Sequence, residues 1–174
     1  FDGITVSGGN FDLSDAPAYD VGWSGIGQYT DQVNPCAFLT FVGAIASEGQ
    51  GVQPRLVERI TDGAVTSYNA SVTKQDRILS RETAATIGQY MRANVAEKYG
   101  DENFPGLTVC AKTGTAEVGE DRKPNATLAG FVEDEKYPFA FVVFVEDGGY
   151  GAQICLPIAS KVLAACKAAA DLQG

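Results

Sequence analysis

A short run near position 112 has the residue types and spacing that bind a carboxylate and assist acyl transfer. The run is Lys112-Thr113-Gly114-Thr115, inside a segment over residues 107–118 that we expect to be a strand. Because side chains alternate along a strand, the Thr113 and Thr115 hydroxyls point to one side, where together they can bind a carboxylate. Lys112 is long enough to bring a positive charge into the same cleft and so to set its electrostatics.

The backbone of this run has further uses. Gly114 has no side chain, so another backbone can approach it closely. The Thr115 backbone N–H is a candidate oxyanion-hole donor, a contribution of roughly 3 kcal/mol in acyl-transfer enzymes. An exposed strand edge also accepts an extended peptide by strand addition. Lys112 and Thr115 are therefore candidate catalytic residues, and Thr113, Gly114 and Thr115 are candidate substrate-binding residues, although the K-T-G triplet alone also fits a chance match in a strand.

The composition excludes several other kinds of site. The chain of 174 residues has no His, which excludes a Ser-His-Asp triad, a Cys-His dyad and imidazole-ligated zinc. Its 13 basic residues are scattered and outnumbered by 22 acidic ones, so nucleic acid and anionic lipid are not expected partners. The four cysteines form no C-x-x-C pair, so we expect buried free thiols, no metal and no cofactor. No segment approaches the run of about 20 apolar residues typical of a membrane span.

The first half of the chain predicts irregular structure followed by a helix, a hairpin and a second helix. Residues 1–32 are rich in Gly, Asp and Ser, and we expect a loop with three aromatic anchors, Phe11, Tyr19 and Trp23. Asn34-Pro35 matches an N-cap followed by proline at the first helical position, so a helix begins there and stops at Gly49 or Gly51. The expected hairpin strands are 52–60 and 64–68, and the second helix is 80–99.

The second half predicts a sheet closed by an apolar helix. We expect strands over residues 107–118, 125–132 and 138–145, the last two forming an antiparallel hairpin. The apolar run in the last strand indicates burial on both faces. An Ala-rich helix is expected over residues 154–172. The prediction is an α+β fold, an antiparallel sheet flanked by helices, in a single domain over residues 1–174.

Several stretches occur in a fixed order along the chain. They are Trp23-Ser24-Gly25-Ile26-Gly27-Gln28 with Val33-Asn34-Pro35, Ala44 to Gly49 with Val52 to Val57, Lys112-Thr113-Gly114-Thr115-Ala116-Glu117, and the strands at 125–131 and 138–145. In this order they resemble the C-terminal part of the penicillin-binding protein transpeptidase family, class B-like, of which K-T-G is a signature. The resemblance covers nearly the whole chain and implies the C-terminal part of the serine β-lactamase/transpeptidase-like fold.

The resemblance also implies the chemistry of a parent enzyme. A Ser in an S-x-x-K motif attacks the D-Ala-D-Ala end of a peptidoglycan stem peptide, and an amine of a neighbouring wall strand resolves the acyl-enzyme. β-Lactams mimic the substrate and stop at the acyl stage. In this family Lys112 would shape the electrostatics, Thr113 and Thr115 would bind the carboxylate, and the Thr115 N–H would hold the oxyanion. Such a parent is membrane-anchored and works at the extracytoplasmic face of the bacterial cytoplasmic membrane.

The other two family motifs have only look-alikes in this chain. Ser71-Val72-Thr73-Lys74 fits S-x-x-K and Ser67-Tyr68-Asn69 fits S-x-N, but they stand in the wrong order and almost touch, in a polar stretch. We interpret both as chance matches. We therefore expect the nucleophile, its Lys and the S-x-N loop upstream of Phe1, with the domain incomplete and this chain alone inactive and not acylated by penicillin. Its uncovered core should meet the upstream half of the domain or promote self-association.

Two alternative functions fit parts of the pattern. A β-lactam sensor or serine β-lactamase-like domain also carries K-T-G on this strand, although residues 25–28 and 44–57 favour the transpeptidase. A non-catalytic peptide-binding module would use the same strand edge without acylation. A purely structural α+β domain with a chance K-T-G is a third and more distant interpretation.

Overall fold

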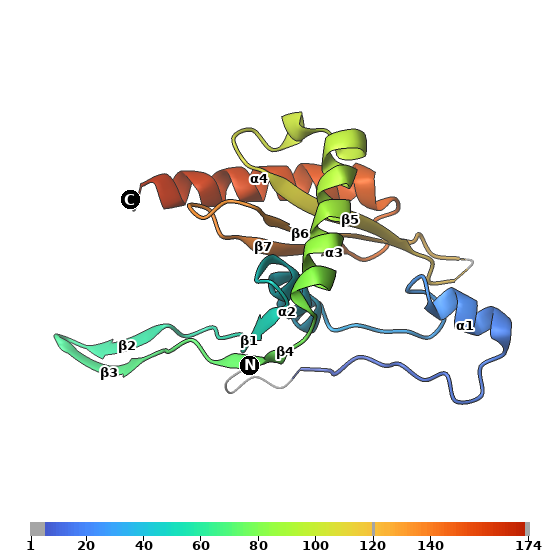
Figure 1. Ribbon diagram of the computed structural model, residues 1–174, viewed down its shortest axis with the longest axis horizontal. Helices are drawn as coiled ribbons and strands as arrows, with labels where there is room; N and C mark the ends of the chain where they lie inside the picture. Colours follow the sequence, from blue (N-terminus) through green and yellow to red (C-terminus); the bar gives the residue numbers. More distant parts are fainter. Residues whose placement is uncertain (1–5, 120, 173–174) are drawn as a thin grey trace.

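The computed structural model describes residues 6–119 and 121–172, and a three-stranded antiparallel sheet lies at its centre (Figure 1). The strands stand in the order β5 (Val109–Ala116), β6 (Asn125–Val132) and β7 (Ala140–Val145). Helix α4 (Gly151–Asp171) covers one face, and helices α2 (Pro35–Ala46) and α3 (Arg81–Asn94) cover the other. The predicted α+β fold, an antiparallel sheet flanked by helices, is confirmed.

Each face of the sheet carries its own hydrophobic core because β6 is buried on both sides. Toward α4, Leu128 of β6 is fully buried with a set of apolar residues that includes Val109, Cys155, Ala159 and Leu163. Toward α2 and α3, β6 contributes Ala129 and Phe131 to a second cluster with Val42, Ile45, Met91 and Cys110. The strand next to the K-T-G run is therefore the central and most buried strand of the sheet.

Local signals start the two helices as the sequence predicts. The Asn34 side chain accepts a hydrogen bond of 2.8 Å from the Cys36 N–H, with Pro35 as the first residue of α2. The Ser80 hydroxyl accepts one of 3.0 Å from the Thr83 N–H at the start of α3.

Helix α3 ends earlier than the predicted 80–99 helix. Its α-helical part stops at Asn94, and η1 (Val95–Tyr99) is a single π-helical turn followed by the 3-10 turn η2 (Asp101–Asn103). A hydrogen bond of 2.8 Å from the Gly100 N–H to the Val95 carbonyl closes the wider turn. Tyr99 is the last residue of this turn.

Two predictions for the first 32 residues are wrong. Helix α1 (Ala18–Ser24) occupies part of the segment predicted as loop. The expected aromatic anchors do not reach the core: Phe11 is 71% exposed, Tyr19 is 70% exposed, and Trp23 packs edge to face on Tyr19. The segment runs along the outside of the molecule, so its rings have no core to enter (Figure 1). Residues 1–5 lie outside the described part.

The single strand predicted over residues 52–60 is two strands. β1 (Gln50–Val52) pairs with β4 (Lys74–Arg77), and β2 (Arg59–Asp62) pairs with β3 (Val65–Asn69). Pro54 lies between them and has no N–H for a ladder hydrogen bond, which explains the break. The predicted hairpin exists as β2–β3. Its residues are exposed, and Figure 1 shows it projecting away from the central sheet.

β7 is not buried on both faces as its apolar run predicts. It is an edge strand, and Phe144 is 44% exposed, whereas the central β6 is the buried strand. Strand order, which the local sequence does not encode, decides the difference. A cavity of about 300 Å³ lies between β7 and the exposed side of α4, where Ile158 and Val162 are 39% and 51% exposed. We call Phe144, Ile158 and Val162 the apolar edge groove.

Helix α4 begins before the predicted 154–172 helix and corrects the expectation that no segment resembles a membrane span. It has 21 residues, and a window of 18 of them has a mean hydropathy of 1.3, which makes it the one helix in the described residues that is long and apolar enough to cross a membrane. Here it packs on the sheet through Cys155, Ala159 and Leu163, which are buried.

All four cysteines are free, as predicted. Cys110 and Cys155 are buried, whereas Cys36 and Cys166 are half-buried, so the expectation of burial holds for two of them. Burial, and after it the charge of Glu133, raises the pKa of the Cys110 thiol to about 12. Because the thiolate is the reactive form, Cys110 is inert at neutral pH.

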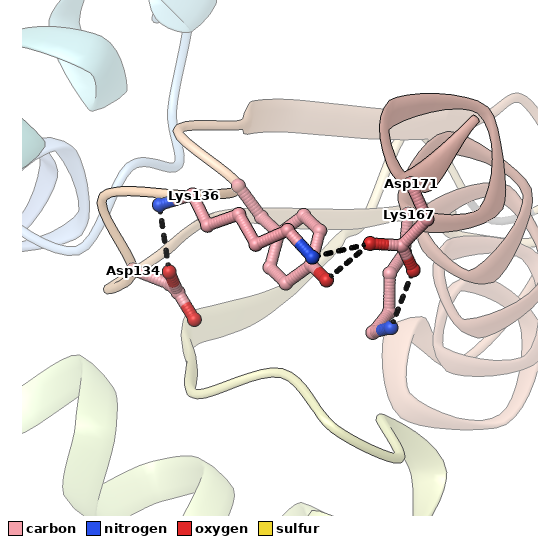
Figure 2. Close-up of polar contacts among 5 residues, drawn as sticks. Asp134, Lys136, Lys167 and Asp171 are labelled. Carbon is pink, nitrogen blue, oxygen red and sulfur yellow. Dashed lines mark hydrogen bonds and ion pairs between the residues drawn. The ribbon is translucent and has the colours of Figure 1, made fainter. Parts of the chain in front are cut away.

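Hydrogen bonds and ion pairs connect the end of α4 to the turn before β7 (Figure 2). The Asp171 carboxylate accepts hydrogen bonds from Lys136 Nζ and Tyr137 OH, both 2.6 Å, and from Lys167 Nζ at 2.9 Å. Both ammonium groups also lie 4.9 Å from the Tyr137 ring centre. The hydrogen bonds from Lys136, Tyr137 and Lys167 hold the pKa of Asp171 well below its usual range.

Asp171→Asn should lower the melting temperature of the chain at pH 7 by about 2 °C, a small effect because water reaches the Lys136 and Asp171 side chains. A carboxyl group whose pKa is depressed on folding stabilises the fold above its unfolded pKa of about 3.9 and loses this effect as the pH falls below that value. The difference in melting temperature between Asp171→Asn and the unmodified chain should therefore shrink as the pH falls from about 4 to about 2. Asp62→Asn, at an exposed carboxylate on β2, is the control. A pH-independent difference would contradict this account.

Candidate functional site

The K-T-G run lies on β5 at a free edge of the sheet. β6 pairs with one side of β5, with Gly114 opposite Thr127 and Thr115 opposite Ala126, and no strand among residues 6–119 and 121–172 pairs with the other side. In an antiparallel pair the backbone groups of every second residue point away from the partner strand. The outward set includes Thr113 and Thr115, because side chains from elsewhere in the fold reach their backbone groups.

Side chains already occupy much of this edge. The Thr113 N–H donates to the Tyr99 hydroxyl at 3.1 Å, and the Thr113 carbonyl accepts from Lys112 Nζ at 2.5 Å. The Thr115 carbonyl accepts from Gln28 Nε2 at 3.3 Å. The edge expected to accept an added peptide strand is therefore closed at Thr113. The outward Thr115 N–H, by contrast, meets no side-chain acceptor among the described residues.

The hydroxyls of Thr113 and Thr115 share one face of β5, the face that α4 covers. Thr113 Oγ1 lies 3.0 Å from the Tyr99 hydroxyl oxygen. Thr115 Oγ1 accepts a hydrogen bond of 3.1 Å from the N–H of Gly151, the first residue of α4. A hydroxyl has one proton and two lone pairs, so the Thr115 hydroxyl keeps its proton for a further acceptor. Carboxylate binding by this pair stays a prediction.

The structure adds a second reason for glycine at position 114, besides the predicted close approach of another backbone. A Cβ at Gly114 would meet the Thr127 hydroxyl of the neighbouring strand. The close backbone approach occurs at its carbonyl, where the first residue of α4, Gly151, lies against the Gly114 and Thr127 carbonyls. Glycine at both positions lets α4 begin directly beside the K-T-G run.

Lys112 is exposed, and its ammonium group makes no ion pair within the described residues. Its one side-chain hydrogen bond in that part of the chain is with the Thr113 carbonyl. The positive charge is thus available to a ligand at the edge of β5. The described residues contain no group of three His, Cys, Asp or Glu that could hold a metal ion.

The look-alike motifs lie elsewhere in the fold. Ser67 is on β3, where its hydroxyl donates to the Ile60 carbonyl across the hairpin. Ser71 is exposed in the segment after β3, and Lys74 is exposed on β4. Figure 1 shows the β2–β3 hairpin and β4 away from the free edge of β5. The fold therefore gives Ser71 no place beside Lys112.

Three contacts at the site were not predicted from the sequence: those of Tyr99, Gln28 and Gly151. Gln28 belongs to a stretch singled out by its resemblance to a family pattern, so a signal existed without a role attached to it. Tyr99 was assigned to a continuous helix, and nothing in its neighbourhood marks a π-turn.

Comparison with known proteins shows which family the chain belongs to. The model of the penicillin binding protein transpeptidase domain matches residues 7–164. The chain belongs to this family. It is 29% identical over 154 residues to the peptidoglycan D,D-transpeptidase PbpA of Mycolicibacterium smegmatis, covering 83% of this chain and 31% of that protein. PbpA of Mycobacterium tuberculosis strain H37Rv is also 29% identical, over 156 residues and with the same coverage of both chains.

Solved structures of penicillin-binding proteins have the same fold. The ceftriaxone acyl-enzyme complex of penicillin-binding protein A from M. tuberculosis superposes with a TM-score of 0.83 at 27% identity, over 94% of this chain and 38% of that one. The D,D-transpeptidase domain of a peptidoglycan glycosyltransferase from Eggerthella lenta superposes with a TM-score of 0.69 at 28% identity, over 84% and 34%. This penicillin-binding protein chain thus spans about a third of its relatives' length.

Proposed function

We propose that this chain forms the K-T-G wall of the active site of a peptidoglycan D,D-transpeptidase that works at the extracytoplasmic face of the bacterial cytoplasmic membrane. The observation that carries the proposal is the edge of β5 that no described strand pairs with. Lys112, which has no ion-pair partner among the described residues, lies there with two hydroxyls and the outward Thr115 N–H. The relatives named D,D-transpeptidase and the acyl-enzyme complexes of penicillin-binding protein A support it.

The proposed reaction is acyl transfer through a serine ester. A serine oxygen attacks the carbonyl carbon of the D-Ala-D-Ala bond, the C–N bond breaks, and the terminal D-Ala leaves after taking up a proton. The Thr115 N–H is placed to stabilise the negative charge on the carbonyl oxygen. Thr113 and Thr115 bind the terminal carboxylate, and Lys112 adds positive charge. A stem-peptide amine then attacks the ester, and β-lactams enter by the same first step.

We propose that the nucleophilic serine belongs to a segment of the longer protein outside this chain. Figure 1 shows β4, which carries Lys74 of the S-x-x-K look-alike, away from β5. The side-chain hydrogen bond of Lys112 within the described residues is with the Thr113 carbonyl and not with a serine. The apolar edge groove would then be covered by that longer protein or, in this chain alone, by a second copy.

Intact mass after reaction with penicillin tests this proposal. The longer protein should gain the mass of one penicillin molecule, because opening of the lactam adds all of its atoms, and this chain alone should gain none. Sedimentation of the same samples should show self-association of the chain but not of the longer protein. A stoichiometric adduct on this chain alone would place the nucleophile within residues 1–174 and overturn the division of the site.

The same experiment separates the alternatives. Release of hydrolysed penicillin with rapid turnover would favour a serine β-lactamase-like protein. Binding of a D-Ala-D-Ala peptide by the longer protein without any acylation would favour a peptide-binding module. The capped edge at Thr113 disfavours the module, because strand addition along β5 needs its outward backbone groups to be free.

A further inference from the structure

Tyr99 is fixed beside Thr113 by the π-turn at the end of α3. The Val95 side chain is fully buried, and its carbonyl accepts the Gly100 N–H at 2.8 Å. The Tyr99 carbonyl accepts a hydrogen bond of 2.6 Å from Asn103 Nδ2. These contacts hold the backbone on both sides of Tyr99, and its ring packs against the buried cluster that contains Val109 and Cys155. π-Turns often occur at functional sites.

The Tyr99 hydroxyl makes two contacts with the same residue. It accepts the Thr113 N–H at 3.1 Å, and it lies 3.0 Å from Thr113 Oγ1. Because the phenol carries a single proton, the second contact runs in one of two directions. When the phenol donates, Thr113 Oγ1 becomes the acceptor and the Thr113 proton is free. When Thr113 donates, its proton is consumed within the protein.

Only the first direction suits a bound anion. A carboxylate has acceptors but no proton, so each threonine must offer it a proton. At Thr115 the direction is already fixed, because the Gly151 N–H can only donate to Thr115 Oγ1. By donating to Thr113 Oγ1, Tyr99 would leave the Thr113 proton available, as the Gly151 N–H does for the Thr115 proton. Hydrogen bonds aligned in this way strengthen one another.

We propose that Tyr99 is a positioning residue that donates to Thr113 Oγ1 and so turns the Thr113 hydroxyl proton toward a carboxylate bound beside β5. This inference rests on the proposed function, because the carboxylate belongs to the peptide or β-lactam substrate. It adds a residue on a different element, 14 positions before Thr113 in the sequence, to the K-T-G run.

The test measures acylation of the longer protein by a penicillin and by the methyl ester of the same penicillin. Tyr99→Phe keeps the ring and removes the proton donor. It should slow acylation by the acid about tenfold, the size expected for one hydrogen bond to a charged group. It should slow acylation by the ester less than about twofold, because the ester carries no charge for Thr113 to bind.

A double substitution shows whether Tyr99 acts through Thr113. In a Thr113→Val background, Tyr99→Phe should cause little further loss of the acylation rate with the acid. In a Thr113→Ser background, which retains the hydroxyl, Tyr99→Phe should again slow acylation about tenfold, equivalent to about 1.4 kcal/mol. An equal loss for acid and ester, or full additivity with Thr113→Val, would overturn the positioning role alone. No acylation of the unmodified longer protein would overturn the proposed function, and this inference with it.

Discussion

Lys112→Ala should slow penicillin acylation of the longer protein by about 100-fold, comparable to the loss of one preorganised electrostatic contact in an acyl-transfer site. The described residues offer Lys112 no carboxylate partner, so its charge is not already neutralised within the fold. Its removal takes away the positive charge that lies beside the Thr113 carbonyl. The measurement is the second-order rate constant of acylation under single-turnover conditions.

Lys74→Ala is the matched control for this prediction. It makes the same substitution at an exposed lysine on β4, in the S-x-x-K look-alike. It should leave the acylation rate unchanged, because β4 lies away from the K-T-G edge (Figure 1). If Lys74→Ala abolished acylation while Lys112→Ala did not, the reactive site would have to be sought around Ser71.

Gly151→Ala should lower the free energy of unfolding by about 2 kcal/mol, although alanine is the better helix former. A Cβ at Gly151 would press against the Gly114 and Thr127 carbonyl oxygens, the second at 2.7 Å. Both are backbone atoms of paired strands and cannot move aside as a flexible side chain would. Urea unfolding monitored by circular dichroism measures the change.

Gly43→Ala, the same substitution at another helical glycine, should raise the free energy of unfolding instead of lowering it. Gly43 lies within α2, and a Cβ there meets no atom within 4 Å. Helix propensity then acts alone, so this variant should be more stable by about 0.5–1 kcal/mol. If Gly151→Ala were stabilised to the same degree, the close packing of α4 on the K-T-G run would be wrong.

Local signals were sufficient for the elements whose ends depend on local chemistry. Caps at Asn34 and Ser80 begin α2 and α3, and β6 occupies the residues predicted for it. The order of strands in the sheet is a different matter. The apolar run of β7 has the composition of a central strand, yet β6 takes that place because β5 pairs on its other side. Sequence periodicity does not report this choice.

In the candidate site, too, some residues could be predicted from local sequence and others depend on the tertiary arrangement. The K-T-G residues could be predicted, because their spacing on a strand determines which side chains share a face. The groups that hold them could not. The Tyr99 contact depends on one extra residue in a helical turn, and the Thr115 contact depends on where α4 docks. Both are contacts between different elements of the fold, which the sequence pattern alone does not bring together.

A crystal structure of the longer protein acylated by penicillin tests the central claim most directly. The account predicts that the drug carboxylate lies within hydrogen-bond distance of the Thr113 and Thr115 hydroxyls, and that its ester carbonyl oxygen accepts the Thr115 N–H. The ester itself should be on a serine outside this chain. A carboxylate bound elsewhere, with the edge of β5 empty, would contradict the assignment of this strand as the wall of the active site.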